Sequence, residues 1–228
     1  MPSDLSTHLA EVRLRIEKAA ERAGRKADEI KLMAVSKTQP VETLRDAIAA
    51  GVNVFGENKV QEAEGKIAEI GRDAAEWHLI GHLQSNKARK AVQLFDVIHS
   101  VDSVELAKKL ERICIEEGRG ALPVFVQVDL AGEETKSGIA ESDLPELAGY
   151  LKTCDRLRFR GLMLLPPFFD EAEAARPYFK RLRCIRDETL PGGELSMGMS
   201  HDFKTAIEEG ATIIRVGTAI FGERKALG

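Results

Sequence analysis

Lys37 closes a short strand-like run, residues 31–37 (KLMAVSK). Side chains alternate between the two faces of a strand, so Met33, Val35 and Lys37 share one face. A lysine at a strand end is ordinarily a solvated charge. An amine there can also form a Schiff base with an aldehyde, provided that burial or nearby cations lower its pKa. Lys37 alone leaves both interpretations open, and Arg215 is a candidate for the neighbouring cation.

Arg215 lies in the apolar run TIIRVGT near the end of the chain. Alternation places Ile213, Arg215 and Gly217 on one face of that strand. A guanidinium in a crowded core requires acceptors, because burying an unpaired charge is very costly. The residue therefore indicates either a structural salt bridge to a core carboxylate or a ligand contact.

Two glycine-containing segments, residues 197–202 (MGMSHD) and 216–222 (VGTAIFG), contain the residue types of a phosphate site. Gly198 and Gly217 allow a close approach of the backbone, and Ser200 and Thr218 offer hydroxyl groups. Ser200 is also a good N-cap for the helix expected after it. With an amine and an arginine nearby, this site predicts a phosphorylated aldehyde cofactor, and a Schiff-base phosphosugar aldolase would use similar groups.

The elements that must position these residues alternate between strand-like and helix-length segments. The strand candidates are residues 31–37, 52–57, 77–81, 97–101, 123–130, 159–165, 195–199 and 212–217. Eight such units favour a single (β/α)8 TIM barrel with an extra N-terminal helix, and function then gathers at the carboxyl ends of the strands. An open flavodoxin-like or Rossmann sheet is the alternative, although no GxGxxG motif follows the first strand.

Composition is typical of one domain spanning residues 1–228. The chain has 43% hydrophobic and 31% charged residues and a net charge of −4. An acidic protein is a poor partner for nucleic acid or an anionic membrane. Cys114, Cys154 and Cys184 form no CxxC pair, and no signal peptide or long apolar run occurs. We expect a cytoplasmic protein with reduced thiols and, since no exposed apolar stripe is apparent, a monomer.

Several ordered motifs closely resemble the YggS/PROSC family of pyridoxal phosphate homeostasis proteins. That family is itself similar to the N-terminal barrel of alanine racemase (fold type III). The matching motifs are AVSKTQP (34–40), FGENKVQEA (55–63), WHLIGHLQSNK (77–87), KSGI (136–139), RGLMLLPP (160–167), LSMGMSHDFKTAIEEGAT (195–212) and RVGTAIFG (215–222). The resemblance implies a barrel that binds pyridoxal 5'-phosphate (PLP).

The resemblance also assigns residues to the cofactor site. It implies that Lys37 carries the internal aldimine and that Arg215 faces the pyridine nitrogen. The phosphate would be held by Ser200, Gly217 and Thr218, and the ring would be lined by Asn58, His78, Ile80 and Met197. An arginine only donates hydrogen bonds, so it keeps the pyridine nitrogen unprotonated and makes the cofactor a poorer electron sink.

Racemisation would need an acid or base opposite the lysine, which in alanine racemase is a tyrosine from a second domain. Here the tyrosines, Tyr150 and Tyr178, fall in expected helices, and His78, His82 or His201 would have to substitute. The sequence thus favours a non-catalytic carrier that buffers PLP and can deliver it to PLP-dependent apo-enzymes. An amino-acid racemase and a Schiff-base aldolase remain the alternatives. Lys136, in an acidic loop, is either a second amine for the cofactor or, by our preferred interpretation, a loop anchor.

Overall fold

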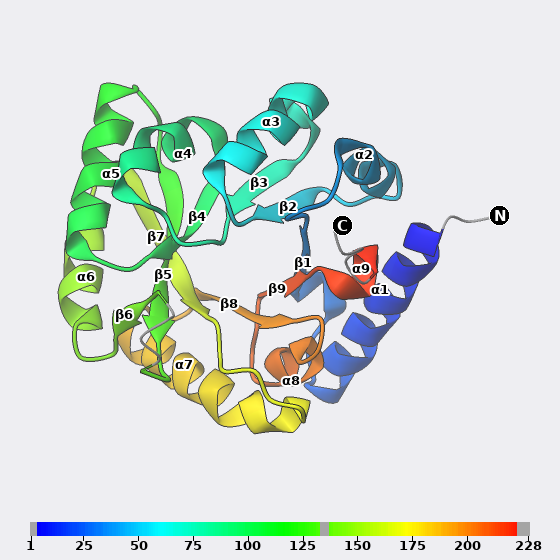
Figure 1. Ribbon diagram of the computed structural model, residues 1–228. Coiled ribbons are helices and arrows are strands. Elements are labelled where there is room, and N and C mark those ends of the chain that lie inside the picture. Colours follow the sequence, from blue (N-terminus) through cyan, green and yellow to red (C-terminus); the bar gives the residue numbers. More distant parts are fainter. Residues whose placement is uncertain (1–3, 133–136, 223–228) are drawn as a thin grey trace.

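Parallel strands close into a barrel in the computed structural model, which describes residues 4–132 and 137–222 (Figure 1). Eight strands pair in sequence order, and β9 returns to pair with β1. The barrel strands are β1 (Lys31–Val35), β2 (Val54–Glu57), β3 (Glu76–Leu79), β4 (Val97–Val101), β5 (Leu122–Asp129), β7 (Leu157–Leu164), β8 (Glu194–Met199) and β9 (Ile213–Val216). The predicted (β/α)8 barrel is confirmed.

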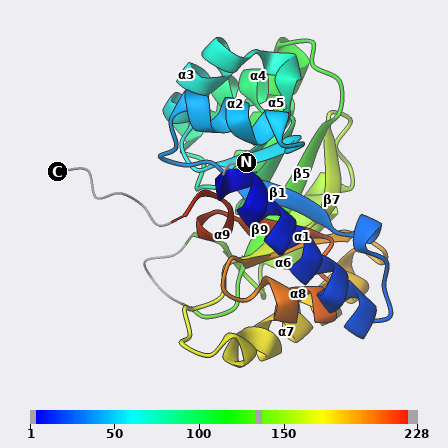
Figure 2. The ribbon, with the colours of Figure 1, turned by 90° about the vertical axis from the view of Figure 1, so that its right-hand side faces the viewer.

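Helices surround this barrel. They are α1 (Asp4–Arg22), α2 (Val41–Ala49), α3 (Val60–Ile70), α4 (Ala88–Leu94), α5 (Val104–Glu116), α6 (Leu144–Leu151), α7 (Arg176–Thr189), α8 (Phe203–Glu208) and α9 (Thr218–Phe221). The helix after β9 has only four residues. The expected N-terminal helix, α1, packs against α8, α9 and α2 and so occupies the ring position that α9 is too short to fill (Figure 2).

The predicted strands all form, with ends that differ by at most two residues. Strand β1 ends at Val35, so Lys37 lies in the turn that follows it. A short additional strand, β6 (Ile139–Ala140), pairs with the end of β5 and was not predicted. Lys136, just before it, lies outside the described residues.

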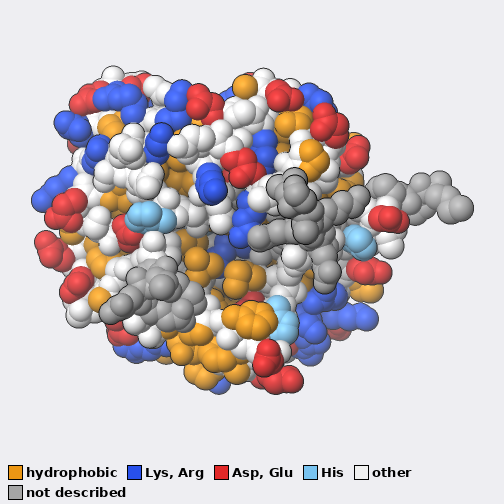
Figure 3. Space-filling model, in the orientation of Figure 1, with side chains coloured by type: hydrophobic (Ala, Val, Ile, Leu, Met, Phe, Trp, Pro, Cys, Tyr) orange, Lys and Arg blue, Asp and Glu red, His pale blue; other side chains and the backbone are white. Residues whose placement is uncertain are grey.

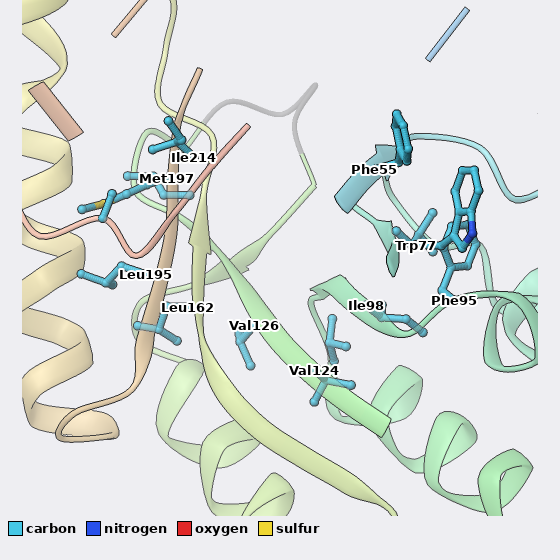
Figure 4. Close-up of a cluster of buried hydrophobic side chains, with 14 of the residues drawn as sticks. Phe55, Trp77, Phe95, Ile98, Val124, Val126, Leu162, Leu195, Met197 and Ile214 are labelled. Carbon is cyan, nitrogen blue, oxygen red and sulfur yellow. The ribbon is translucent and has the colours of Figure 1, made fainter. Parts of the chain in front are cut away.

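The core has two layers because alternate strand residues point into the barrel or toward the helices. The inner cluster consists of Met33, Val54, Ile80, Val97, Phe125, Met163 and Ile213. A larger outer cluster fills the space between strands and helices, and Figure 4 shows part of it, including Phe55, Trp77 and Ile214. Within the described ranges, no helix has the length and apolar character needed to cross a membrane.

Candidate cofactor site at the carboxyl ends of the strands

Lys37 lies half-buried in a strained turn at the carboxyl end of β1. In β1, Met33 and Val35 share the inward face, as the alternation predicts, and the placement of Lys37 on that face stays a prediction. The next residue, Thr38, has φ 65°, a left-handed conformation that is unfavourable for a β-branched side chain. Surrounding contacts must hold this turn in place.

A buried ion cluster between the barrel wall and α3 supplies those contacts. Lys66 Nζ donates to the Ser36 carbonyl oxygen (2.6 Å), to Glu57 Oε1 (2.7 Å) and to Glu62 Oε1 (2.7 Å). Glu62 Oε1 also accepts from the Thr38 backbone N–H at 2.5 Å, and Ser36 Oγ donates to Glu57 Oε1 at 2.6 Å. The cluster thus binds the backbone on both sides of Lys37, at Ser36 and at Thr38.

Glu57 and Lys66 are a buried pair that sequence reasoning did not include in the site. Their side chains are 0% and 7% exposed, respectively. Burial raises the pKa of Glu57, and Lys66 opposes that effect by attraction and hydrogen bonding. The signal was present in the sequence, because Glu57 ends an otherwise apolar strand and so is a carboxylate in a buried position.

Arg215 is buried in the barrel interior and bonded to neutral acceptors. It donates from Nη1 to the Ser196 carbonyl oxygen (2.6 Å) and to Ser196 Oγ (2.9 Å), and from Nη2 to the Leu164 carbonyl oxygen (2.8 Å). Burial lowers its pKa to about 10, which leaves it protonated at neutral pH. Among the described residues, the acceptors of Arg215 are two carbonyl oxygens and a hydroxyl. The predicted alternative of a structural salt bridge to a core carboxylate is therefore wrong for these contacts.

Ser200 links the ends of β8 and β9. Its Oγ accepts hydrogen bonds from the backbone N–H groups of Gly217 (3.1 Å) and Ala219 (3.3 Å). The prediction that Ser200 caps the following helix is wrong: α8 begins after Asp202, whose carboxylate accepts from the Met199 N–H at 2.6 Å. The hydroxyl crosses instead to the loop that carries the other predicted phosphate-binding residues.

Gly217 and Thr218 lie at the start of α9, beside the end of β1. A Cβ atom on Gly217 would come 3.4 Å from the Val35 carbonyl oxygen, so this glycine is close to the strand that leads to Lys37. Gly198 has φ 93° at a bulge in the pairing of β8 with β9, which redirects the strand just before Ser200. The amine and the phosphate-binding candidates are thus brought to the same end of the barrel.

Asn58 and Ile80 also belong to this end of the barrel. Ile80 contacts the inner cluster, and Asn58 is half-buried directly after β2. Gly81 is pressed against Asn58, since a Cβ atom on Gly81 would lie 2.2 Å from the Asn58 carbonyl oxygen and 2.7 Å from its Cα. Position 81 therefore requires glycine, and the close contact restricts the backbone position of Asn58 after β2.

His78 is fully buried, with both ring nitrogens near polar partners. Its Nδ1 is 2.8 Å from His99 Nε2, and its Nε2 is 2.9 Å from Glu76 Oε1. His99 Nδ1 is in turn 3.0 Å from Ser196 Oγ, the hydroxyl that Arg215 also contacts. Sequence reasoning missed His99 and Ser196, although each is a polar residue at an inward position of a buried strand.

Met197 points away from the barrel interior. It belongs to the outer cluster, and Figure 4 shows it near Leu195 and Ile214 on the helix side of the strands. Its neighbour Ser196 points inward, as the contact with Arg215 requires. The placement gives no support to the prediction that the Met197 side chain lines a cofactor ring.

The surface over this end of the barrel is hollowed and contains a mixture of side chains. Figure 3 shows Lys and Arg side chains near the middle of the face, with hydrophobic side chains beside them. Phe168 is 77% exposed, and its ring lies 5.8 Å from that of His201. His82 contacts Asp102 at 3.3 Å. His82 thus has a carboxylate partner, and His201 has an aromatic neighbour.

Comparison with known proteins identifies the family. Residues 7–225 match the family model for the N-terminal domain of alanine racemase. The chain is 45% identical to the pyridoxal phosphate homeostasis protein of Pseudomonas aeruginosa over 226 residues, which cover 97% of this chain and 96% of the relative. It is 43% identical to the Aquifex aeolicus protein of that name, covering 95% and 97% of the two chains. The chain belongs to the pyridoxal phosphate homeostasis protein family.

Solved structures of the family have the same fold. PipY of Synechococcus elongatus with PLP bound superposes with a TM-score of 0.84 and 40% identity, covering 96% of this chain and 100% of PipY. Alanine racemase of Corynebacterium glutamicum has a TM-score of 0.65 at 18% identity, and the match covers 95% of this chain but 62% of the racemase. That second likeness concerns the fold alone, and its partial coverage indicates that the racemase extends beyond the barrel shared with this family.

Proposed function

We propose that the protein binds pyridoxal 5'-phosphate at the carboxyl end of its barrel, as a Schiff base on Lys37, and serves in cellular PLP homeostasis. The observation that carries the proposal is the common location of three groups: the half-buried amine of Lys37, the buried cation of Arg215, and the Ser200-linked loop after β9. In this order, the three groups are suited to bind the aldehyde, the ring nitrogen and the phosphate of the cofactor. The PLP-bound structure of PipY supports the choice of cofactor.

Each group of the site has a defined part in this proposal. Ser200, Gly217 and Thr218 hold the phosphate, while Asn58 and Ile80 contact the ring. Arg215 donates to the pyridine nitrogen and keeps it unprotonated, because a guanidinium has no acceptor. When bound, PLP supplies an electron sink, and this arrangement makes it a weak one. The turn at Lys37 orients the amine.

We further propose that the protein carries the cofactor and does not turn over a substrate. Both tyrosines lie on outer helices, where Tyr178 contacts Phe169 and Tyr150 lies 5.9 Å from Lys108 Nζ. Neither lies at the strand ends, so no tyrosine of the described chain faces Lys37 as a catalytic acid. The names of the relatives also favour homeostasis. Racemase activity, the alternative, predicts exchange of an amino acid's α-proton with deuterated water, which Lys37→Ala would abolish.

Replacing Lys37 tests the central claim. Titration of the wild-type protein with PLP should produce the visible absorbance of a Schiff base, and Lys37→Ala should abolish it because no amine remains at that position. Lys59→Ala, at an exposed lysine just before α3, is the matched control and should bind as wild type. Visible absorbance that survives in Lys37→Ala would contradict the proposal, whereas a colourless wild-type protein would favour an aldolase.

Delivery to other proteins requires a separate test. PLP-loaded protein is mixed with a PLP-dependent apo-enzyme in the presence of a scavenger of free PLP. Activation that survives the scavenger supports direct delivery, and its loss limits this protein to buffering. Size measurement of the same sample, together with cell fractionation, tests the expectations of a monomer and of a cytoplasmic location.

A further inference from the structure

A continuous chain of polar groups crosses the barrel interior below the proposed cofactor site. It runs from Arg215 through Ser196, His99 and His78 to Glu76, with successive contacts of 2.9, 3.0, 2.8 and 2.9 Å. These five residues come from four strands, and all except Glu76 are buried. A polar chain in an otherwise apolar barrel is costly unless its hydrogen bonds are satisfied, so its arrangement needs an explanation.

The far end of the chain is an anchored negative charge. Glu76 contacts His78 and also accepts two hydrogen bonds from Lys31 Nζ, at 3.2 and 3.0 Å. The contact with His78, aided by Lys31, outweighs partial burial and lowers the pKa of Glu76 to about 2. Lys31 and Glu76 both line a hollow of about 500 Å³ at the amino-terminal ends of the strands, opposite the cofactor site. An ionised carboxylate accepts hydrogen bonds and cannot donate.

The direction of every bond follows from this charge. The ionised Glu76 favours the proton on the nearer nitrogen of His78, Nε2, even though the N–H is not well aligned with the carboxylate. Burial lowers the pKa of both His78 and His99, so each ring is neutral and carries one proton. The bare His78 Nδ1 must accept from His99 Nε2–H, and the bare His99 Nδ1 must accept from the Ser196 hydroxyl. That hydroxyl oxygen then accepts from Arg215.

We propose that Glu76, His78, His99 and Ser196 are positioning residues. The charge of Glu76 orients a one-way hydrogen-bond relay that runs from His78 through His99 and Ser196, and this relay holds Arg215 so that its remaining N–H groups are presented to the ligand. The relay and the two carbonyl oxygens fix the guanidinium, and no carboxylate is among its hydrogen-bond acceptors in the described part of the chain. Among the described residues, three of its five donors are engaged, and the others point to a role toward the cofactor. This inference rests on the proposed PLP site, but the relay exists in the cofactor-free protein.

The packing of the two histidines supports a relay that is fixed in one state. The His99 ring stacks on Phe125, with centroids 4.3 Å apart and an interplanar angle of 7°. The centroids of His78 and His99 are 5.0 Å apart. Held in this way, neither ring can turn over to exchange its nitrogens without displacing the inner core. Because both rings are held in place, the orientation of Arg215 is coupled to Glu76 through the relay.

Nitrogen NMR of histidine-labelled, cofactor-free protein tests the direction of the relay. At neutral pH both rings should show a protonated Nε2 and a bare Nδ1, with signals assigned from His78→Asn and His99→Asn. A proton on Nδ1 of His99, or a doubly protonated ring at either position, would reverse the relay and overturn the proposal. This measurement needs no PLP, so its result stands even if the proposed cofactor site fails.

Glu76→Gln tests the coupling to Arg215 with little risk to the fold, since a third of this side chain is exposed and glutamine has the same shape. We expect the tautomers of both rings to become mixed and PLP release to accelerate about three- to tenfold, within the range of energetic coupling through packed networks. Glu194→Gln is the matched control: Glu194 begins β8, pairs with Arg160 and is not part of the relay. Unchanged His99 signals in Glu76→Gln, or equal effects of the two variants, would refute the relay.

Discussion

At the scale of single residues, the site depends on where a few polar atoms are allowed to point. Ser200 is a plain example, because its hydroxyl could cap α8 and instead contacts Gly217 and Ala219. Arg215 is another: carbonyl oxygens and a hydroxyl accept its hydrogen bonds, while Asp202 supports its charge only through space. Both residues belong to the proposed ligand region for reasons that are local to their strands.

Removing the Ser200 hydroxyl should weaken phosphate binding selectively. Ser200→Ala loses one hydrogen-bonding group worth about 1 to 1.5 kcal/mol, or roughly tenfold in affinity. We expect that loss for PLP and no loss for pyridoxal, which lacks the phosphate, measured by equilibrium titration of both ligands. Ser142→Ala, at an exposed turn, is the control. An equal loss for the two ligands would mean that Ser200 supports the loop and does not contact phosphate.

At the scale of elements, the loops after β1 and β2 are shaped by contacts behind the barrel wall. From α3, Lys66 contacts Ser36 and Glu62 contacts Thr38, on either side of Lys37. Gly81 lets the loop after β3 touch Asn58. Neither Lys66 nor Gly81 faces the ligand region. Instead, they keep the backbone of these loops in conformations that are unfavourable by themselves, such as the left-handed conformation of Thr38.

Replacing Lys66 should destabilise the fold strongly. Lys66→Met leaves the carboxylate of Glu57 buried and uncompensated, which costs about 3 to 5 kcal/mol in the free energy of unfolding. The double variant Glu57→Gln with Lys66→Met removes the orphaned charge and should recover part of that loss. Urea denaturation measures both, and PLP titration of the folded double variant should show weaker binding because the Lys37 turn is released. Normal stability in Lys66→Met would show that the buried pair is not needed.

Adding one methyl group at Gly81 should displace Asn58. Gly81→Ala places a Cβ atom within 3 Å of three Asn58 backbone atoms, so the loop must move. We expect weaker PLP binding and reduced thermal stability. Gly65→Ala, in α3 with open space around it, should leave binding unchanged and add up to about 1 kcal/mol of stability from helix propensity. Equal behaviour of the two variants would show that Asn58 has room to move.

At the scale of the whole molecule, the barrel places neutral histidines at its centre and ionised groups at its two ends. His78 and His99 stay neutral because burial opposes a positive charge on either ring. In the unfolded chain both would titrate near the ordinary histidine pKa of about 6.5. The difference couples the stability of the entire barrel to pH.

Stability should therefore fall as the pH drops below about 6.5, the ordinary histidine pKa. The unfolded chain takes up protons that the folded His78 and His99 cannot, so the stabilisation is present above that pH and is lost below it. Each histidine contributes a slope of up to about 1.4 kcal/mol per pH unit. Urea unfolding across the mildly acidic range measures this slope, and His99→Asn should reduce it by about one proton. A flat profile would mean that these histidines protonate in the folded state.

Much of the fold and part of the site follow from sequence periodicity. Alternating strand and helix patterns predicted the eight-stranded barrel. Period-two alternation grouped Lys37 with Met33 and Val35, and Arg215 with Ile213, because neighbouring side chains in a strand must point in opposite directions. The same rule, applied to Ser196, would have turned Met197 outward. These are properties of single strands, so the sequence alone determines them.

Only the tertiary structure decided how those strands meet. The relay joins four strands, the Lys66 cluster joins two strands to a helix, and α1 fills the ring position of the short α9. Such contacts depend on strand register and on the bulge at Gly198, which no local pattern reveals. The sequence placed a lysine, an arginine and a serine near strand ends, and closure of the barrel brought them to one end, with a polar network beneath them.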